Sequence, residues 1–227
     1  MKWEVVGDLD SLCCVFFAGF GFNIGTYKES LKPNTLVVFD YRDFNNAKEL
    51  LCLLEQRQFH LVAFSMGVSV AHRILSPLCE HITQSIAING TILGIDKTKG
   101  IHPSVFTHTM KHFCPQAFVQ NCLNKQNVPH FHTLLNDTNA LIAELKSLHD
   151  FSQAQQCENL TRNTLIWNRA VISLQDCIFK PEVQNLAWSA YKQSYDTYFM
   201  AQKPFEICHI EAPHFVFKDS NAYKTIY

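Results

Sequence analysis

The chain has 227 residues, of which 47% are hydrophobic and 17% are charged. This composition is typical of a compact globular protein rather than a disordered one. The net charge of −1 gives no overall attraction to nucleic acid. No apolar run reaches the ~18–20 residues needed to span a bilayer, and the start Met1-Lys2-Trp3-Glu4 is acidic too early for a signal peptide. We expect one domain, with room for an inserted subdomain.

The nine cysteines are an odd number, which argues against a disulfide framework. Cys13, Cys14, Cys52 and Cys208 lie inside apolar runs. We therefore expect reduced, buried thiols, as in a cytosolic protein. No CxxC pair occurs, so we do not expect a zinc site.

Short apolar runs in the first part of the chain predict β-strands. These runs are Val5–Val6, Leu12–Phe17, Thr35–Phe39, Phe59–Phe64 and Gln84–Ile88. Helical patterns run from Asn45 or Asn46 to about Gln56 and from Met66 to Leu75. Strands that alternate with helices predict a mostly parallel sheet with helices on both faces. Functional sites form at the carboxyl ends of such strands.

From about residue 100 to residue 161 the alternation stops and helical patterns dominate. They cover Val105–Met110, Pro115–Leu123 and an apolar stripe from Leu134 to Leu148. We interpret residues 100–161 as a helical cap inserted into an α/β core of residues 1–99 and 162–227.

The segment from Lys97 to Asn136 contains five histidines and four lysines, but no Asp or Glu. The lysines are Lys97, Lys99, Lys111 and Lys125. In a nearly neutral chain this pattern predicts a local basic patch, which Arg162 would extend. A solvated helix surface explains the same pattern about as well.

After the cap, Thr164–Trp167 predicts that the strand pattern resumes, and Asp176 follows a few residues later. Pro181 suits the first turn of a helix. Phe205–Ile210 predicts the last strand, and His214 lies just beyond it.

The stretch from Leu61 to Ala71 has the layout of a nucleophile elbow, in which a strand, a sharp turn and a helix follow one another. Ser65 occupies the turn, and the small residues that the strained turn requires are Ala63 and Gly67. The helix that follows presents free N–H groups to a developing oxyanion. The alternative is that Ser65 only caps this helix.

A serine nucleophile needs a base, and the base needs an acid to orient it. Ser65, Asp176 and His214 occur in the chain order expected of α/β-hydrolases. His209 is the nearest rival base, but we expect its ring to point into a packed face of the last strand. Asp196 is a weaker candidate acid than Asp176 because it lies in a helical or irregular stretch away from a strand end.

Five stretches together resemble the BioG type of pimeloyl-[acyl-carrier protein] methyl ester esterase, over essentially the whole chain. They are Phe17-Ala18-Gly19-Phe20-Gly21, Leu61-Val62-Ala63-Phe64-Ser65-Met66-Gly67-Val68, Ala87-Ile88-Asn89-Gly90-Thr91, Asp176-Cys177-Ile178-Phe179 and Glu211-Ala212-Pro213-His214-Phe215-Val216-Phe217. The resemblance implies an α/β-hydrolase fold: a mostly parallel central sheet flanked by helices, with an inserted helical cap.

The resemblance also implies a cytoplasmic enzyme of biotin synthesis with no metal or organic cofactor. Its substrate would be a pimeloyl methyl ester held as a thioester on acyl-carrier protein. Ser65 would attack the ester, His214 would be the base, Asp176 would orient His214, and the N–H groups of Phe20 and Met66 would hold the oxyanion.

Two alternatives remain open. A thioesterase or acyltransferase would use the same three residues, because ester and thioester cleavage need the same nucleophile. A non-catalytic module that binds carrier protein would keep the fold and use Ser65 only as a helix cap.

Overall fold

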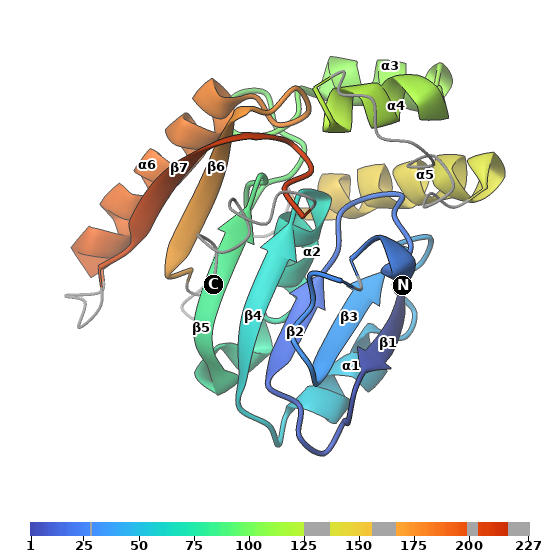
Figure 1. Ribbon diagram of the computed structural model, residues 1–227. Coiled ribbons are helices and arrows are strands. Elements are labelled where there is room, and N and C mark those ends of the chain that lie inside the picture. Colours follow the sequence, from blue (N-terminus) through green and yellow to red (C-terminus); the bar gives the residue numbers. More distant parts are fainter. Residues whose placement is uncertain (28, 125–136, 156–166, 199–203, 218–227) are drawn as a thin grey trace.

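The computed structural model describes residues 1–27, 29–124, 137–155, 167–198 and 204–217. These residues form a seven-stranded sheet with the strand order β1-β3-β2-β4-β5-β6-β7 (Figure 1). The strands are β1 (Lys2–Val6), β2 (Cys14–Phe17), β3 (Thr35–Phe39), β4 (Phe59–Phe64), β5 (Ile82–Ile88), β6 (Arg169–Gln175) and β7 (Glu206–Pro213). β1 is antiparallel to β3, and the other neighbouring strands are parallel. The predicted mostly parallel sheet is therefore confirmed.

Strand β4 lies at the centre of the sheet. Its residue Ala63 is paired with Phe17 of β2 on one side and with Ala87 of β5 on the other. All the β4 side chains except that of His60 are buried, as expected of a strand covered on both faces. The turn that follows β4 is thus held by neighbouring strands on both sides.

The strand expected at Thr164–Trp167 lies later in the chain, at Arg169–Gln175. Trp167 precedes it, and residues 164–166 lie outside the described residues. The apolar pattern of β6 is weak, because Ala170, Val171 and Ile172 are buried whereas Leu174 is exposed and Arg169 at its start reaches Glu206 of β7.

The described helices agree closely with the helical patterns of the sequence. They are α1 (Ala47–Leu54), α2 (Met66–Ile74), α3 (Pro103–Lys111), α4 (Pro115–Cys122), α5 (Thr138–Gln155) and α6 (Pro181–Tyr198), with short 3₁₀ helices η1 (Ile24–Thr26) and η2 (Ser76–His81). Helices α3, α4 and α5 lie between β5 and β6 in the chain and beyond the carboxyl ends of the central strands (Figure 1).

The two faces of the sheet are covered differently. Leu50 of α1, Val68 of α2, Leu145 of α5 and Trp188 of α6 belong to one apolar cluster with the side chains of one sheet face, such as Leu61. From β3 to β7 each connection steps in the same direction across the sheet. Right-handed crossovers therefore place the connecting helices on one face.

On the opposite face, helix α4 contributes Cys122, Phe118 and Val119 to the apolar cluster, and loop residues cover much of the rest that the structure describes. There, Phe16 and Phe64 of the sheet pack against loop residues, and the ring centroids of Phe64 and Phe217 are 5.0 Å apart. Tyr27 and Phe215 belong to the same cluster. Aromatic side chains from two loops thus cover part of the sheet face that a helix often covers in such folds.

The described cysteines are all free, but they are less buried than predicted. Cys14 is buried in β2, whereas Cys13 and Cys52 are exposed and Cys208 is half-buried. An apolar run does not bury every member, because Cys13 precedes β2 and Cys52 lies on the outer side of α1. No helix in the described part of the chain is long and apolar enough to cross a membrane.

Candidate active site

Ser65 lies on a sharp turn between β4 and α2, in a backbone conformation with φ 57° and ψ −128°. Residues other than glycine rarely adopt a positive φ, and such strain is concentrated at functional sites. A Cβ atom on Gly67 would lie 2.4 Å from the carbonyl oxygen of Ala18. Glycine is therefore required where α2 packs directly against the end of β2, as the elbow pattern predicted.

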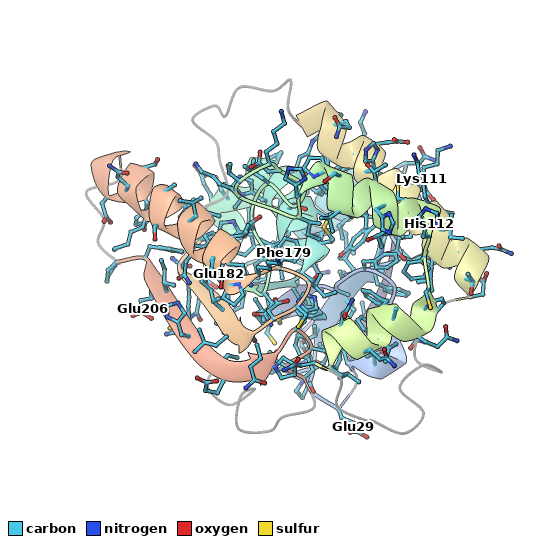
Figure 2. The ribbon with its side chains drawn as sticks, turned by 90° about the horizontal axis from the view of Figure 1, so that it is seen from above. Glu29, Lys111, His112, Phe179, Glu182 and Glu206 are labelled. Atoms are coloured by element: carbon cyan, nitrogen blue, oxygen red, sulfur yellow. The ribbon has the colours of Figure 1, made fainter. Side chains whose placement is uncertain are left out.

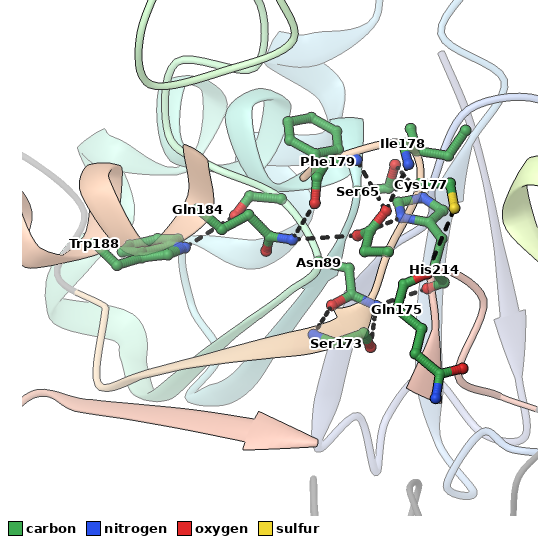
Figure 3. A network of polar contacts seen from close by, with 12 residues as sticks. Ser65, Asn89, Ser173, Gln175, Cys177, Ile178, Phe179, Gln184, Trp188 and His214 are labelled. Carbon is green, nitrogen blue, oxygen red and sulfur yellow. Dashed lines mark hydrogen bonds and ion pairs between the residues drawn. The ribbon is translucent and has the colours of Figure 1, made fainter. Parts of the chain in front are cut away.

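The structure brings together the three residues that the sequence singled out (Figure 3). His214 Nε2 lies 3.0 Å from Ser65 Oγ, and His214 Nδ1 lies 2.8 Å from Asp176 Oδ2. Asp176 directly follows β6 and His214 directly follows β7, and all three side chains are at most 4% exposed. The hydroxyl of Ser65 makes no capping hydrogen bond to α2, which removes the support for a purely capping role.

The carboxylate of Asp176 accepts hydrogen bonds from three groups besides His214. The backbone N–H groups of Ile178 and Phe179 donate to Oδ1, at 2.7 and 2.9 Å. The side-chain amide of Gln184 donates to Oδ2, at 3.2 Å. Hydrogen bonds to both oxygens fix which oxygen faces the imidazole.

The backbone around His214 is held by Asn89, a buried residue at the end of β5 with φ 48°. Its Nδ2 donates to the carbonyl oxygen of His214 (2.7 Å) and to Oγ of Ser173 (2.8 Å). Its Oδ1 accepts from the N–H of Ser173 (2.8 Å). One side chain thereby joins the carboxyl ends of β5, β6 and β7. The spacing of residues gave no direct indication of this role.

Neither rival residue reaches the serine. His209 lies within β7 as expected, but its ring is exposed and its Nε2 is 2.8 Å from Oδ1 of Asn185. The prediction that its ring would point into a packed face was wrong. The ring lies at the exposed margin of the sheet, next to Asn185 of α6. Asp196 lies in α6 and pairs with Lys192 one turn earlier.

The loop after β2 runs against the nucleophile. A Cβ atom on Gly19 would lie 2.8 Å from the ring of Phe64 and 3.1 Å from Cβ of Ser65. Phe20 is the next residue, and Met66 is the first residue of α2. The two segments that carry the predicted oxyanion donors therefore both adjoin Ser65.

Aromatic rings surround this part of the site. Phe20 contacts Phe113 and Phe118, with ring centroids 5.7 and 5.2 Å apart. On the other side, Phe64 and Phe179 lie against the ring of His214, at 4.9 and 6.3 Å. Such apolar surroundings suit an acyl chain and strengthen electrostatic interactions within the site.

Glu144 of α5 is a buried acid that the sequence interpretation missed. Its Oε1 accepts from the N–H of Tyr41 (3.2 Å), and the Tyr41 hydroxyl donates to the carbonyl oxygen of Ala18 (2.7 Å). Burial raises the pKa of Glu144 to about 7, against the opposing effect of the N–H groups of Tyr41 and Gly21. Its spacing from Leu141 and Leu148, which places it on the apolar face of α5, was the available signal.

The structure describes three of the five predicted basic residues. Lys97 and Lys111 are exposed and Lys99 is half-buried, whereas Lys125 and Arg162 lie outside the described residues. Lys111 lies beside His112 at the end of α3, away from Phe179, which lies against His214 (Figure 2). Within the described residues, no group of three or more His, Cys, Asp or Glu side chains could hold a metal ion.

A sheet of this topology with a serine at the turn after its central strand is the framework of the α/β-hydrolases, and the match to an esterase family makes the protein an enzyme of that class. The family model described as pimeloyl-ACP methyl esterase BioG matches residues 1–218. The chain therefore belongs to the BioG family of esterases.

Two relatives and two solved structures show how far the similarity extends. A malonyl-[acyl-carrier protein] O-methyltransferase of Bacteroides fragilis is 30% identical over 190 residues, which are 78% of this chain but only 36% of that protein. An uncharacterized protein of Haemophilus influenzae is 27% identical over 183 residues, 77% of this chain and 81% of that protein. This chain thus spans about a third of the length of the methyltransferase.

The crystal structure of BioG from Haemophilus influenzae is 25% identical, covers 100% of both chains and has a TM-score of 0.77. A lipase-esterase related protein from Clostridium acetobutylicum has a TM-score of 0.64 at 14% identity, covering 99% of this chain and 96% of that one. The second likeness shows the fold alone.

Proposed function

We propose that the protein hydrolyses the methyl ester of pimeloyl-[acyl-carrier protein] methyl ester to pimeloyl-[acyl-carrier protein] and methanol, in the cytoplasm and for biotin synthesis. The observation that carries this proposal is the hydrogen-bonded chain from Ser65 through His214 to Asp176 in a member of the BioG family. The three residues form the catalytic triad.

In the first half of the reaction His214 Nε2 takes the proton of Ser65 Oγ, and the oxygen attacks the ester carbonyl carbon. The N–H groups of Phe20 and Met66 stabilise the oxyanion, and each such donor contributes about 3–4 kcal/mol in a well-formed hole. The C–O bond to the methoxy group then breaks, and His214 gives the proton to the leaving oxygen, so that methanol departs.

In the second half a water molecule gives a proton to His214 and attacks the acyl-enzyme. The bond to Ser65 Oγ breaks, the serine recovers its proton from His214, and the free carboxyl group of the pimeloyl chain is released. Asp176 remains ionised and holds the imidazole with its N–H at Nδ1.

The proposal assigns the two parts of the chain different tasks. The core of residues 1–99 and 162–227 carries the triad, and the helical cap of residues 100–161 contributes Phe113 and Phe118 beside Phe20, while its helix α5 also packs on the sheet. The aromatic rings around Phe20 receive the acyl chain. Lys97, Lys99, Lys111, Lys125 and Arg162 attract the acidic carrier protein, mainly by raising the encounter rate.

The second candidate is a thioesterase or acyltransferase with the same triad, since nothing in the hydrogen bonds of Ser65 distinguishes the two carbonyl groups of the substrate. The non-catalytic binding module is disfavoured because Ser65 makes its side-chain hydrogen bond to His214 and none to the helix.

The deciding experiment incubates the protein with the carrier-bound pimeloyl methyl ester and follows both possible products by mass spectrometry. Release of methanol with the thioester intact supports the proposal, whereas release of free carrier thiol supports a thioesterase. Ser65→Ala should lower turnover by at least ~10⁴-fold with thermal unfolding unchanged. Ser194→Ala, at an exposed serine of α6, is the matched control and should keep full activity.

A further inference from the structure

Gln184 is a fully buried side chain near the start of α6, on the far side of Asp176 from His214. Its Nε2 donates to Asp176 Oδ2 at 3.2 Å and to the carbonyl oxygen of Phe179 at 2.6 Å (Figure 3). Both neighbours are acceptors, so the amide nitrogen has to face them. Its Oε1 then has no hydrogen-bond partner among the described residues.

A buried oxygen without a partner is unfavourable, and it is uncommon enough in folded proteins to need a reason. A methionine would fill nearly the same volume without burying that oxygen. Packing alone therefore does not account for a glutamine at this position. The two hydrogen bonds that its amide donates do account for it, because one is accepted by the carboxylate of Asp176 and the other by the backbone of the same loop.

The next turn of the same helix face bonds Gly90, which lies behind the serine at the other end of the triad. Trp188 follows Gln184 by four residues, so the two side chains project from one side of α6. Its Nε1 donates to the carbonyl oxygen of Gly90 at 3.0 Å. Gly90 packs directly behind the nucleophile, since a Cβ atom there would lie 2.2 Å from the carbonyl oxygen of Ser65. One helix face thus bonds both the acid and the residue that packs behind the serine.

We propose that α6 positions the triad, with Gln184 as the positioning residue for Asp176 and Trp188 as that for the Ser65 turn. This inference rests on the proposed catalytic role of Ser65, Asp176 and His214. Gln184 holds Oδ2 toward His214 Nδ1 and shares the negative charge of that oxygen. Without it Oδ2 is held less firmly, and the charge of that oxygen acts on the imidazole alone and favours the protonated ring. A protonated ring cannot accept the proton of Ser65.

The test compares Gln184→Met with Gln193→Met, an exposed glutamine of the same helix. Two readouts that do not need the carrier protein are used across a range of pH: hydrolysis of p-nitrophenyl butyrate, and labelling of Ser65 by a fluorophosphonate. In labelling, Ser65 Oγ bonds to phosphorus, fluoride leaves, and His214 takes the serine proton. Thermal unfolding of each variant is measured in parallel.

For Gln184→Met we expect kcat and the labelling rate to fall about 10- to 100-fold while KM changes by less than about twofold. The acidic limb of the pH profile should move to higher pH. Gln193→Met should match the wild type in all of these. Trp188→Phe keeps the aromatic packing and loses only the bond to Gly90, so we expect a smaller fall in kcat with the acidic limb in place.

A wild-type protein that the fluorophosphonate does not label would overturn the proposed function, and this inference with it. A reactive wild type with unchanged kcat and pH profile in Gln184→Met would overturn this inference alone. Should Gln184→Met fail to fold, Trp188→Phe decides, and wild-type kcat in that variant would show that α6 does not position the triad.

Discussion

The two sides of the active site are built from different interactions. On the side of β5, β6 and β7, the triad is held by hydrogen bonds from Asn89, Gln184 and backbone N–H groups. On the side of β2 and β3, the loop that carries Phe20 is held by rings of α4 and its surroundings and by the carboxyl of Glu144 on α5.

This difference follows from what each side has to do. Proton transfer between Ser65 and His214 requires atoms held at hydrogen-bonding distance, and amide groups supply that geometry without titrating. In the proposed function the Phe20 side accommodates an apolar chain, for which aromatic packing, being less directional, is suitable. It also contains Glu144, whose pKa of about 7 makes it sensitive to conditions near neutrality.

The largest expected effect on kcat comes from removing the base of the triad. His214→Ala should lower kcat by about 10⁴-fold, because the serine then has no base, whereas His209→Ala should keep activity close to that of the wild type. His209 is the matched control, because it is an exposed histidine of β7, the strand that precedes His214, and bonds Asn185 instead. Turnover of a p-nitrophenyl ester measures both variants, and an inactive His209→Ala would mean that the base has been misassigned.

The next effect tests how tightly the triad side is packed. In Gly90→Ala the new methyl group would meet the carbonyl oxygen of Ser65 at 2.2 Å and Cγ2 of Val68 at 2.9 Å. The elbow has to shift, so we expect about 100-fold lower kcat and a loss of about 1–3 kcal/mol in the free energy of unfolding.

Gly25→Ala is the control for this substitution, because its methyl group would meet only the side-chain oxygen of Asn23, at 3.1 Å. Both variants are measured by urea unfolding and by turnover. Equal behaviour of the two variants would mean that the turn behind Ser65 has more room than the structure shows.

The third prediction concerns the pH dependence of stability that Glu144 causes on the Phe20 side. Because the pKa of Glu144 rises from 4.5 to about 7 on folding, the folded protein holds a proton that the unfolded chain has lost in that pH window. Stability therefore falls as pH rises from 4.5 to 7, by about 3 kcal/mol from this group. Its pKa is raised by burial first and then by Asp40, while the N–H groups of Tyr41 and Gly21 and the charge of Arg42 lower it.

Glu144→Gln should remove this dependence, because the amide resembles the protonated acid. Urea unfolding at pH 5 and pH 8 measures it, and the variant should lose less stability than the wild type between the two values. His72, whose pKa burial lowers to about 4, contributes equally to both proteins and cancels. Glu49→Gln, at an exposed glutamate of α1, should behave as the wild type does. A wild-type slope in Glu144→Gln would contradict the assignment.

The sequence predicted the parts of the site that depend on local order along the chain. Ser65, Asp176 and His214 could be found because each follows a strand, and the ends of parallel strands meet at one edge of the sheet. The elbow was recognisable because only small residues fit at Ala63 and Gly67. These are short-range requirements, and a single sequence displays them.

The supporting residues could not be found in this way. Asn89 contacts the backbone of His214, which lies 125 positions away, and Glu144 contacts Tyr41 at a separation of 103. Gln184 looks like any polar residue in the first turn of a helix until the register of α6 against β6 is known. The loops that cover the second sheet face were missed for the same reason, since rings such as Phe217 act through distant packing.

The smallest expected effect concerns Lys111, one of the predicted basic residues. Lys111 is exposed at the end of α3, and an exposed ion pair contributes only ~0.2–1 kcal/mol. Lys111→Glu should therefore raise KM for the carrier-bound ester by a few-fold and leave hydrolysis of a small soluble ester unchanged. Lys48→Glu, at an exposed lysine of α1, makes the same charge change elsewhere and should have a weaker effect.

Salt should slow the carrier-bound reaction more than the small-ester reaction, because added ions screen exposed charges. Equal losses on both substrates would mean that Lys111 supports the active site. No loss on either would mean that the carrier protein binds to another surface.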